Sequence, residues 1–222
     1  MVASETVSVP VDGSVIAGDL VVPPGSGGMV LFAHGSGSSR HSPRNRAVAA
    51  RLQEAGLGTL LLDLLTVREE QEDAVTGQYR FDIGLLGRRV VAAVDWLAQR
   101  PDAAGLPLGI FGASTGAAAA LLAAAERPDR VQAVVSRGGR PDLAEQALDG
   151  VRAPVLLIVG GADTEVLRMN REAAEQLSAP HLVHVVPGAT HLFEESGALE
   201  EVADTACRWF LRPGEPLREQ GA

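Results

Sequence analysis

The sequence contains no lysine, only one cysteine and few aromatic residues. All 19 of its basic residues are arginine, and 28 acidic residues bring the formal net charge to −9. Because phosphate binding needs a basic surface, a chain this acidic is not expected to have a nucleic-acid partner. The single cysteine, Cys207, cannot form a disulfide within the chain, which favours a reducing compartment and hence a cytoplasmic location.

Long apolar segments are also absent. The longest run, Ala117–Ala125, is far shorter than the roughly 18 residues that a membrane span needs, and it is typical of a buried helix. The first residues carry neither a basic nor an apolar segment, so no secretion signal is expected. By contrast, 46% hydrophobic residues over 222 positions are enough for a sizeable core. We expect a single domain over residues 1–212, a flexible tail at 213–222 and no membrane partner.

Apolar runs that alternate with helical stretches predict the fold class. Two strands joined by a tight turn at Asp12-Gly13 open the chain as a β-hairpin. Short runs without a polar face follow, and these are typical of strands covered on both sides. The predicted strands are 5–11, 15–22, 29–33, 59–62, 108–111, 131–135, 155–159 and 182–186, and the predicted helices are 43–55, 82–99, 115–126, 167–177 and 199–211. This order predicts an α/β protein with a mostly parallel sheet of about eight strands, with ligands beyond the carboxyl ends of the strands.

The segment Gly112-Ala113-Ser114-Thr115-Gly116 is the first candidate for chemistry. It matches G-x-S-x-G and lies between an apolar strand and an Ala-rich helix. A serine at such a strand-to-helix turn is held in a strained conformation, with its hydroxyl above the sheet and beside the free N–H groups of the helix. The alternative is an ordinary serine cap at a helix N-terminus. With the partners described next, the context favours Ser114 as a nucleophile.

A serine hydroxyl needs a base, and the base needs an orienting group. In the order serine, acid, histidine, the chain supplies Asp163 after one apolar strand and His191 after the last one. A turn or capping role is the alternative for Asp163, and Asp142 and Glu165 are competing acids. Of the other histidines, His34 lies in a turn and His41 in a polar loop, and His181 and His184 lie in or beside the last strand.

A second motif, His34-Gly35-Ser36-Gly37, follows the strand at 29–33. Such a loop turns backbone N–H groups toward an oxyanion that develops in the transition state. We assign the N–H groups of Ser36 and Thr115 to this oxyanion hole. The alternative is a plain Gly/Ser loop in which the His34 side chain bonds to the backbone.

These motifs resemble those of the α/β-hydrolase superfamily, and within it the dienelactone hydrolase-like group. The resemblance runs from about Thr6 to Leu211 and rests on the two motifs above and on the segments 161–163 and 188–193. It implies Ser114 as the nucleophile, His191 as the base, Asp163 as its orienting group, and hydrolysis of ester-like bonds through an acyl-enzyme. Relatives of this kind also occur fused to phosphoribosyltransferase domains, but this sequence has no phosphate loop of that type.

One residue departs from the family pattern. Dienelactone hydrolases proper use a cysteine nucleophile, whereas this position is Ser114, and Cys207 lies in the last helix as a core residue. The substrate that the family name denotes therefore does not carry over. Residues 136–154 leave room for only a helical turn or two, so we expect no substantial lid and an open site.

Two arginine-rich loops follow strand ends, at 39–46 and 136–140. Basic groups gathered there in an acidic protein are suited to a carboxylate or phosphate on the substrate, and Arg40 and Arg137 are the candidates. The alternative is that these arginines pair with local acids or lie in solvent, and the usual surface position of charged loop residues favours it.

The sequence thus predicts a serine hydrolase for carboxylic esters or lactones of small acyl compounds, with Ser114, Asp163 and His191 as catalytic residues. No organic cofactor or metal is implied, since no helical histidine pair or Cys/His cluster is present. The alternatives are a thioesterase or acyltransferase with the same three residues, or a non-catalytic binding protein on this fold. No particular oligomeric state is indicated.

Overall fold

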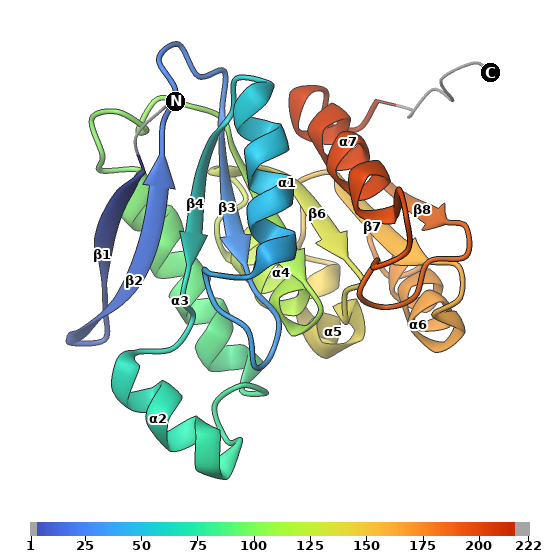
Figure 1. The fold of residues 1–222 in the computed structure, drawn as a ribbon, viewed down its shortest axis with the longest axis horizontal. Coiled ribbons are helices and arrows are strands. Elements are labelled where there is room, and N and C mark those ends of the chain that lie inside the picture. Colours follow the sequence, from blue (N-terminus) through green and yellow to red (C-terminus); the bar gives the residue numbers. More distant parts are fainter. Residues whose placement is uncertain (1–3, 216–222) are drawn as a thin grey trace.

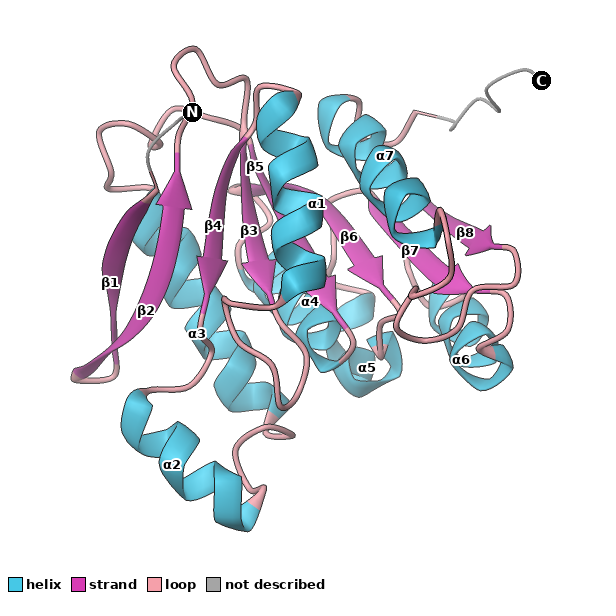
Figure 2. Ribbon diagram, viewed as in Figure 1, coloured by secondary structure: helices cyan, strands magenta, loops and turns pink. Residues whose placement is uncertain are grey.

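The computed structural model describes residues 4–215, and its centre is an eight-stranded sheet (Figure 2). The strand order is β1-β2-β4-β3-β5-β6-β7-β8. The β1/β2 hairpin and the β2/β4 pair are antiparallel, and every other pair is parallel. The strands are β1 (Glu5–Val11), β2 (Ser14–Val21), β3 (Met29–Ala33), β4 (Gly58–Leu62), β5 (Leu108–Ala113), β6 (Val131–Arg137), β7 (Val155–Gly160) and β8 (His181–Val186). The predicted fold class and all eight predicted strands are confirmed.

Helices cover both faces of the sheet. Figure 1 shows α1 and α7 on one face and α3, α4 and α6 on the other. The helices are α1 (Pro43–Glu54), α2 (Val67–Thr76), α3 (Ile83–Leu97), α4 (Thr115–Glu126), α5 (Glu145–Leu148), α6 (Thr164–Ala174) and α7 (Ala198–Leu211), and a 3₁₀ helix spans Pro141–Ala144. None of the helices within residues 4–215 has the length and apolar content that crossing a bilayer requires.

The buried side chains form two layers, one on each face of the sheet. In β3, Leu31 and Ala33 pack toward α3 and α4, whereas Val30 and Phe32 pack toward α1 and α7. Because both faces are covered, the parallel strands need apolar residues at every position. This explains why the sequence shows continuous apolar runs instead of alternation.

The structure differs from the sequence-based prediction at several helices. Helix α2 was not predicted at all, and α6 begins at Thr164, three residues before the predicted start. Between β6 and β7 the chain forms only the short 3₁₀ helix and α5, in agreement with the absence of a substantial lid. From residue 216 on, the predicted flexible tail lies outside the described residues.

Candidate active site

Ser114 occupies a sharp turn between β5 and α4. Its backbone angles are φ 50° and ψ −121°, and positive φ is otherwise found in only two described non-glycine residues, Asp12 and Phe193. Such a conformation costs a non-glycine residue of order 1–3 kcal/mol. Although Ser114 precedes the first residue of α4, its side chain makes no capping hydrogen bond. The capping interpretation of this serine therefore has no support in the geometry.

Glycine is required on both sides of this turn because the backbones approach so closely. A Cβ atom on Gly116 would overlap the carbonyl oxygen of Ala33, and one on Gly112 would overlap the Ala117 backbone. These contacts let α4 start against the end of β3. They also bring the β3–α1 loop, residues 34–42, beside the nucleophile: a Cβ on Gly35 would lie 3.0 Å from Ser114 Cβ.

Asp163 and His191 meet across the ends of β7 and β8. The Nδ1 atom of His191 donates to Oδ2 of Asp163 at 2.8 Å, with the tautomer assigned from this partner. The approach depends on Gly160, where a Cβ atom would overlap the Ala189 backbone. Asp163 stands at the N-cap position of α6, yet its carboxylate does not cap that helix. The carboxylate thus binds the imidazole in place of the helix N-terminus.

Ser114 and His191 flank the same two residues at the end of β6. The Ser114 N–H donates to the Arg137 carbonyl at 3.2 Å. On the next residue, a Cβ added to Gly138 would lie 3.5 Å from Cε1 of the His191 ring. The fold thus gathers the three predicted catalytic residues at the carboxyl ends of β5, β7 and β8.

The competing acids and histidines all have other partners. Asp142 forms an ion pair with Arg140, and Glu165 pairs with Arg168. The ring nitrogens of the remaining histidines also have partners. His34 contacts the backbone of Gly35 and Leu64, and His41 contacts Arg46. His181 contacts the Ala179 carbonyl, and His184 contacts Glu201. Position along the chain favours Asp163 and His191, and among the candidate acids and histidines these two are the pair that a hydrogen bond joins in the structure.

His34 anchors the β3–α1 loop from within the protein. Its Nε2 accepts the Leu64 N–H at 3.0 Å, so Nδ1 carries the proton and donates to the Gly35 carbonyl at 2.8 Å. Burial lowers the pKa of His34 below its ordinary value, and the neighbouring Gly35 carbonyl and Asp63 only partly oppose this. A neutral imidazole therefore joins this loop to the segment that follows β4.

The two residues assigned to the oxyanion hole contact each other. The Ser36 N–H donates to the hydroxyl Oγ1 of Thr115 at 2.8 Å. Thr115 is the first residue of α4, where backbone N–H groups have no acceptor within the helix. The threonine side chain therefore joins the β3–α1 loop to the start of α4, directly after Ser114 in the chain.

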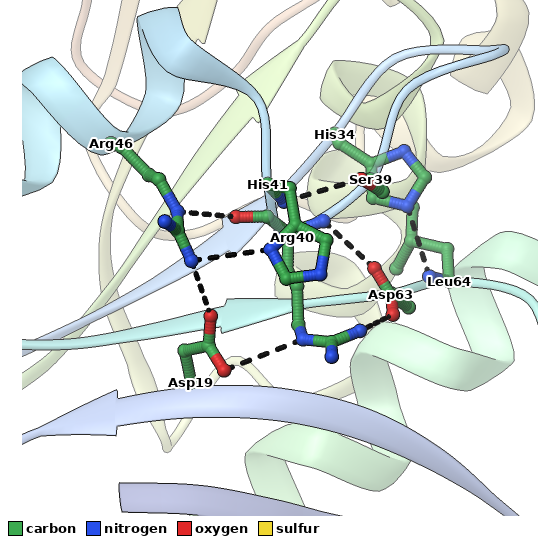
Figure 3. A network of polar contacts seen from close by, with 8 residues as sticks. All are labelled: Asp19, His34, Ser39, Arg40, His41, Arg46, Asp63 and Leu64. Carbon is green, nitrogen blue, oxygen red and sulfur yellow. Dashed lines mark hydrogen bonds and ion pairs between the residues drawn. The ribbon is translucent and has the colours of Figure 1, made fainter. Parts of the chain in front are cut away.

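Arg40 is held by two carboxylates (Figure 3). Its guanidinium forms ion pairs with Asp19 of β2 and Asp63 after β4, and its backbone N–H donates to Asp63 Oδ1 at 2.8 Å. Arg46 also reaches Asp19, at 2.9 Å. These contacts correspond to the alternative in which the loop arginines pair with acids, and they fasten the β3–α1 loop to the sheet.

Arg137, the other arginine candidate, lies apart from Arg40 and has a different environment. Its side chain points to the α1/α7 face, where NH2 is 3.4 Å from Oδ1 of Asn45 in α1. Burial, with a smaller contribution from the nearby Arg44, lowers the pKa of Arg137 to about 10. The structure thus separates the two arginines that the sequence had grouped.

A pocket of about 250 Å³ adjoins the β3–α1 loop on the side of α2. The capping box of Thr66 and Glu69 starts α2. In its last turn, Oδ2 of Asp73 accepts a hydrogen bond from Nε of Arg80 at 2.6 Å. Burial alone would raise the pKa of Asp73, but hydrogen bonds from Arg80 and Tyr79 hold it below its ordinary value. The pocket is lined by His34 to Ser39, Asp63 to Leu65, Glu70, Asp73, Ala74, Arg80 and Leu86.

Ser114, Asp163 and His191 do not line this pocket, which reaches the proposed site through Gly35 and Ser36. Sequence reasoning missed the pocket wall that α2 provides. The available signal was Thr66-x-x-Glu69, a capping-box pattern that predicts a helix start. Residues 4–215 contain no group of three His, Cys, Asp or Glu side chains arranged to hold an ion.

Comparison with known proteins shows which family this chain resembles. The model of the dienelactone hydrolase family matches residues 22–218. A solved dienelactone hydrolase from Anabaena variabilis is 59% identical, with a TM-score of 0.93, and the match covers 95% of this chain and 97% of that one. Est1E from Butyrivibrio proteoclasticus shares the fold at 18% identity, with a TM-score of 0.77 over 93% of this chain and 97% of that one.

A curated relative from Mycobacterium tuberculosis carries the name phosphoribosyl transferase. It is 57% identical over 196 residues, which are 88% of this chain but only 43% of that protein. The chain therefore spans less than half the length of this relative.

Proposed function

Since the chain belongs to the dienelactone hydrolase family, we propose that it is a serine hydrolase that cleaves carboxylic esters or lactones of small acyl compounds. The observation that carries the proposal is the 2.8 Å hydrogen bond from His191 to Asp163, made by an aspartate that leaves its own helix uncapped. A carboxylate that orients an imidazole beside a strained serine is the arrangement that activates a hydroxyl nucleophile.

In the proposed reaction Ser114 attacks the carbonyl carbon while His191 takes the hydroxyl proton on Nε2. The carboxylate of Asp163 holds Nδ1–H, so the imidazole presents its free nitrogen to the serine. The imidazolium then returns the proton to the leaving alcohol as the C–O bond breaks. Water attacks the acyl-enzyme by the same route and releases the acid, which restores the Ser114 hydroxyl.

The oxyanion is stabilised by the N–H groups of Ser36 and Thr115. In the structure the Ser36 N–H already has an acceptor, Oγ1 of Thr115. As negative charge develops on the substrate oxygen, the N–H exchanges a neutral hydroxyl for a charged acceptor, which makes the stronger hydrogen bond. The interaction is thus gained in the transition state, as catalysis requires.

The pocket beside the β3–α1 loop, which includes Ser36 but none of the three proposed catalytic residues, is small. About 250 Å³ is below the roughly 300–1,000 Å³ of sites for drug-sized ligands. The short segment between β6 and β7 adds no cover to the site. Phosphoribosyl transfer is not part of this proposal, because the match to the mycobacterial relative covers only 43% of that protein.

Labelling with a fluorophosphonate probe tests the proposal. We expect the wild-type protein to be labelled and to hydrolyse p-nitrophenyl esters of short acids, and we expect Ser114→Ala to do neither while keeping its circular dichroism spectrum. A panel of acyl thioesters then separates an esterase from a thioesterase. A folded wild-type protein that neither reacts with the probe nor hydrolyses any ester would favour the binding-protein alternative.

A further inference from the structure

Asn170 is a polar residue within the buried stripe of α6. The buried residues of this helix are Val166, Asn170, Ala173 and Ala174, which recur at helical spacing, and Asn170 is 0% exposed. A leucine would suit such a position better, because burying an amide is costly and asparagine is a weaker helix former. Oδ1 of Asn170 is buried without a hydrogen-bond partner in the described part of the chain, which adds to that cost. What asparagine offers here over leucine is therefore the pair of N–H donors on its amide.

The amide of Asn170 joins α6 to the turn that follows β6, residues 137–140, which we call the β6 turn. Nδ2 donates to the carbonyl of Gly139 at 2.9 Å and to the carbonyl of Val166, in the first turn of α6, at 2.8 Å. Both acceptors are backbone carbonyls, which fixes the assignment of the amide nitrogen and oxygen. Gly139 is itself buried, so its carbonyl needs a donor from within the protein. One side chain thus connects the helix that begins after Asp163 with the β6 turn.

The β6 turn holds the backbone of Ser114 from both sides. The Ser114 N–H donates to the carbonyl of Arg137 at 3.2 Å, and the Ser114 carbonyl accepts the N–H of Arg140 at 3.1 Å. Gly139 lies between these two residues, where a Cβ atom would overlap Oγ of Ser136. The two ends of one tightly packed segment therefore hold the proposed nucleophile in its strained conformation.

The same turn contacts the proposed base. A Cβ atom on Gly138 would lie 3.3 Å from the carbonyl oxygen of His191 and 3.5 Å from Cε1 of its ring. His191 in turn bonds to Asp163, which stands at the N-cap position of α6. Ser114, His191 and Asp163 therefore belong to a closed ring of contacts, and the amide of Asn170 completes that ring between α6 and the β6 turn.

We propose that Asn170 is a positioning residue whose hydrogen bond to Gly139 fixes α6, and with it Asp163, relative to the turn that holds Ser114 and contacts His191. This inference rests on the proposed hydrolase function and adds a residue to it. Because Asn170 is fully buried, it acts through the Gly139 carbonyl and not by touching substrate. Without this bond α6 and the β6 turn are free to shift against each other, and a misplacement of about 1 Å in reacting groups can cost roughly a hundredfold in rate.

Steady-state kinetics with p-nitrophenyl butyrate test the proposal. Asn170→Leu keeps a side chain of similar volume in the buried stripe and removes both amide donors. We expect kcat to fall roughly ten- to hundredfold while KM stays within about twofold, because the alignment of the reacting groups changes and the binding surface does not.

Thr59→Val is the matched control. Thr59 is also 0% exposed, and its Oγ1 accepts a hydrogen bond from Nε2 of Gln53 at 2.7 Å. It lies near the amino end of β4, at the edge of the sheet away from the proposed site. This variant also loses a buried side-chain hydrogen bond, so we expect a comparable fall in Tm with an unchanged kcat.

A double-mutant cycle shows whether Asn170 acts through the proposed acid. In a protein that already carries Asp163→Asn, the position of α6 matters little to the reaction, so adding Asn170→Leu should lower kcat by less than about threefold, as for residues that act as one unit. An effect that is only structural would lower kcat by the same factor in both backgrounds, and that result would overturn the positioning role.

The remaining outcomes are distinct from one another. An Asn170→Leu protein with the kcat of the wild type, a loss confined to KM, or an equal loss of kcat in Thr59→Val would overturn the inference and leave the hydrolase proposal intact. Absence of Ser114-dependent hydrolysis in the wild type would overturn both. If Asn170→Leu does not fold, Asn170→Ala, which removes the amide without adding a new side chain, is judged by the same kcat and KM. Failure of both variants to fold would show that Asn170 serves only the fold and would refute its role in positioning.

Discussion

The strained backbone of Ser114 predicts a gain in stability when the proposed nucleophile is replaced by glycine. At φ 50° and ψ −121° the serine carries roughly 1–3 kcal/mol of strain, which glycine does not. Glycine in turn lowers stability by roughly 0.5–1 kcal/mol, because the unfolded chain gains freedom. The net expectation for Ser114→Gly relative to Ser114→Ala is a gain of about 1 kcal/mol, since alanine keeps the strain and also lacks the hydroxyl.

This difference is measurable by calorimetry. For 222 residues the entropy of unfolding is about 0.5 kcal/mol/K, so 1 kcal/mol corresponds to about 2 °C in Tm. Ser8→Gly in the exposed part of β1 is the control, because Ser8 has an ordinary negative φ and should lose stability on the same change. A Ser114→Gly protein that melts at or below the temperature of Ser114→Ala would refute the reasoning that the turn stores strain.

Four further predictions follow from contacts around the site. Thr115→Val leaves the Ser36 N–H without an acceptor and should lower the free energy of unfolding by about 1–3 kcal/mol, whereas Thr115→Ser should restore it; urea titrations measure both. Arg40→Gln should lower kcat/KM equally for neutral and anionic esters, because its charge is used by protein carboxylates; a selective loss on the anionic ester would contradict this. Asp163→Asn should lower kcat by roughly 10³–10⁴ with an unchanged fold, and a loss below tenfold would remove the aspartate from the mechanism. Since the pKa of His34 is lowered by folding, its contribution to stability is present above its unfolded pKa, near 6.5, and is lost as the pH falls below that value; unfolding measured from pH 8 to 5 should show a smaller decline in His34→Gln than in the wild type.

The sheet and the catalytic candidates could be predicted because each leaves a local signal in the sequence. A parallel strand buried on both faces appears in the sequence as a continuous apolar run, as at Val155–Gly160. The end of that run and the start of the next helix locate the loop at the carboxyl end of the strand. The motif around Ser114 requires glycines at fixed spacing, since neighbouring backbones fill the space of a Cβ. The order of Asp163 and His191 then follows from the strands that precede them.

Helix α2 left a weaker signal because packing against the core contributes little to it. Two of its valines, Val67 and Val75, are exposed, and its only buried residue is Asp73. The helix is held instead by its capping box and by the ion pair of Asp73 with Arg80. An apolar stripe is what periodicity detects, and this helix has none, so the pocket wall that it provides was not predicted.

The two arginine loops show where sequence reasoning ends and geometry must decide. Both place arginine just after a strand, and composition alone treats them alike. Arg40 meets Asp19 in β2 and Asp63 just after β4, which lie 21 and 23 residues away in the chain, whereas Arg137 contacts the neutral amide of Asn45 and lies near another arginine, Arg44. Only the order of strands in the sheet determines which carboxylates reach which guanidinium, and no local pattern encodes that order.

The contacts of the β3–α1 loop hold the backbone of Ser36, one of the two proposed oxyanion donors, without a lid. His34 binds the loop to the segment after β4, Arg40 binds it to β2, and Thr115 binds it to α4. Because the loop backbone is fixed from three directions, the change needed when charge develops is the transfer of the Ser36 N–H from Thr115 Oγ1 to the substrate oxygen, and such a preorganised backbone is a main source of electrostatic catalysis. Loosening any one anchor should therefore lower kcat more than it raises KM, because the donors matter in the transition state and little in the binding of the neutral ground state.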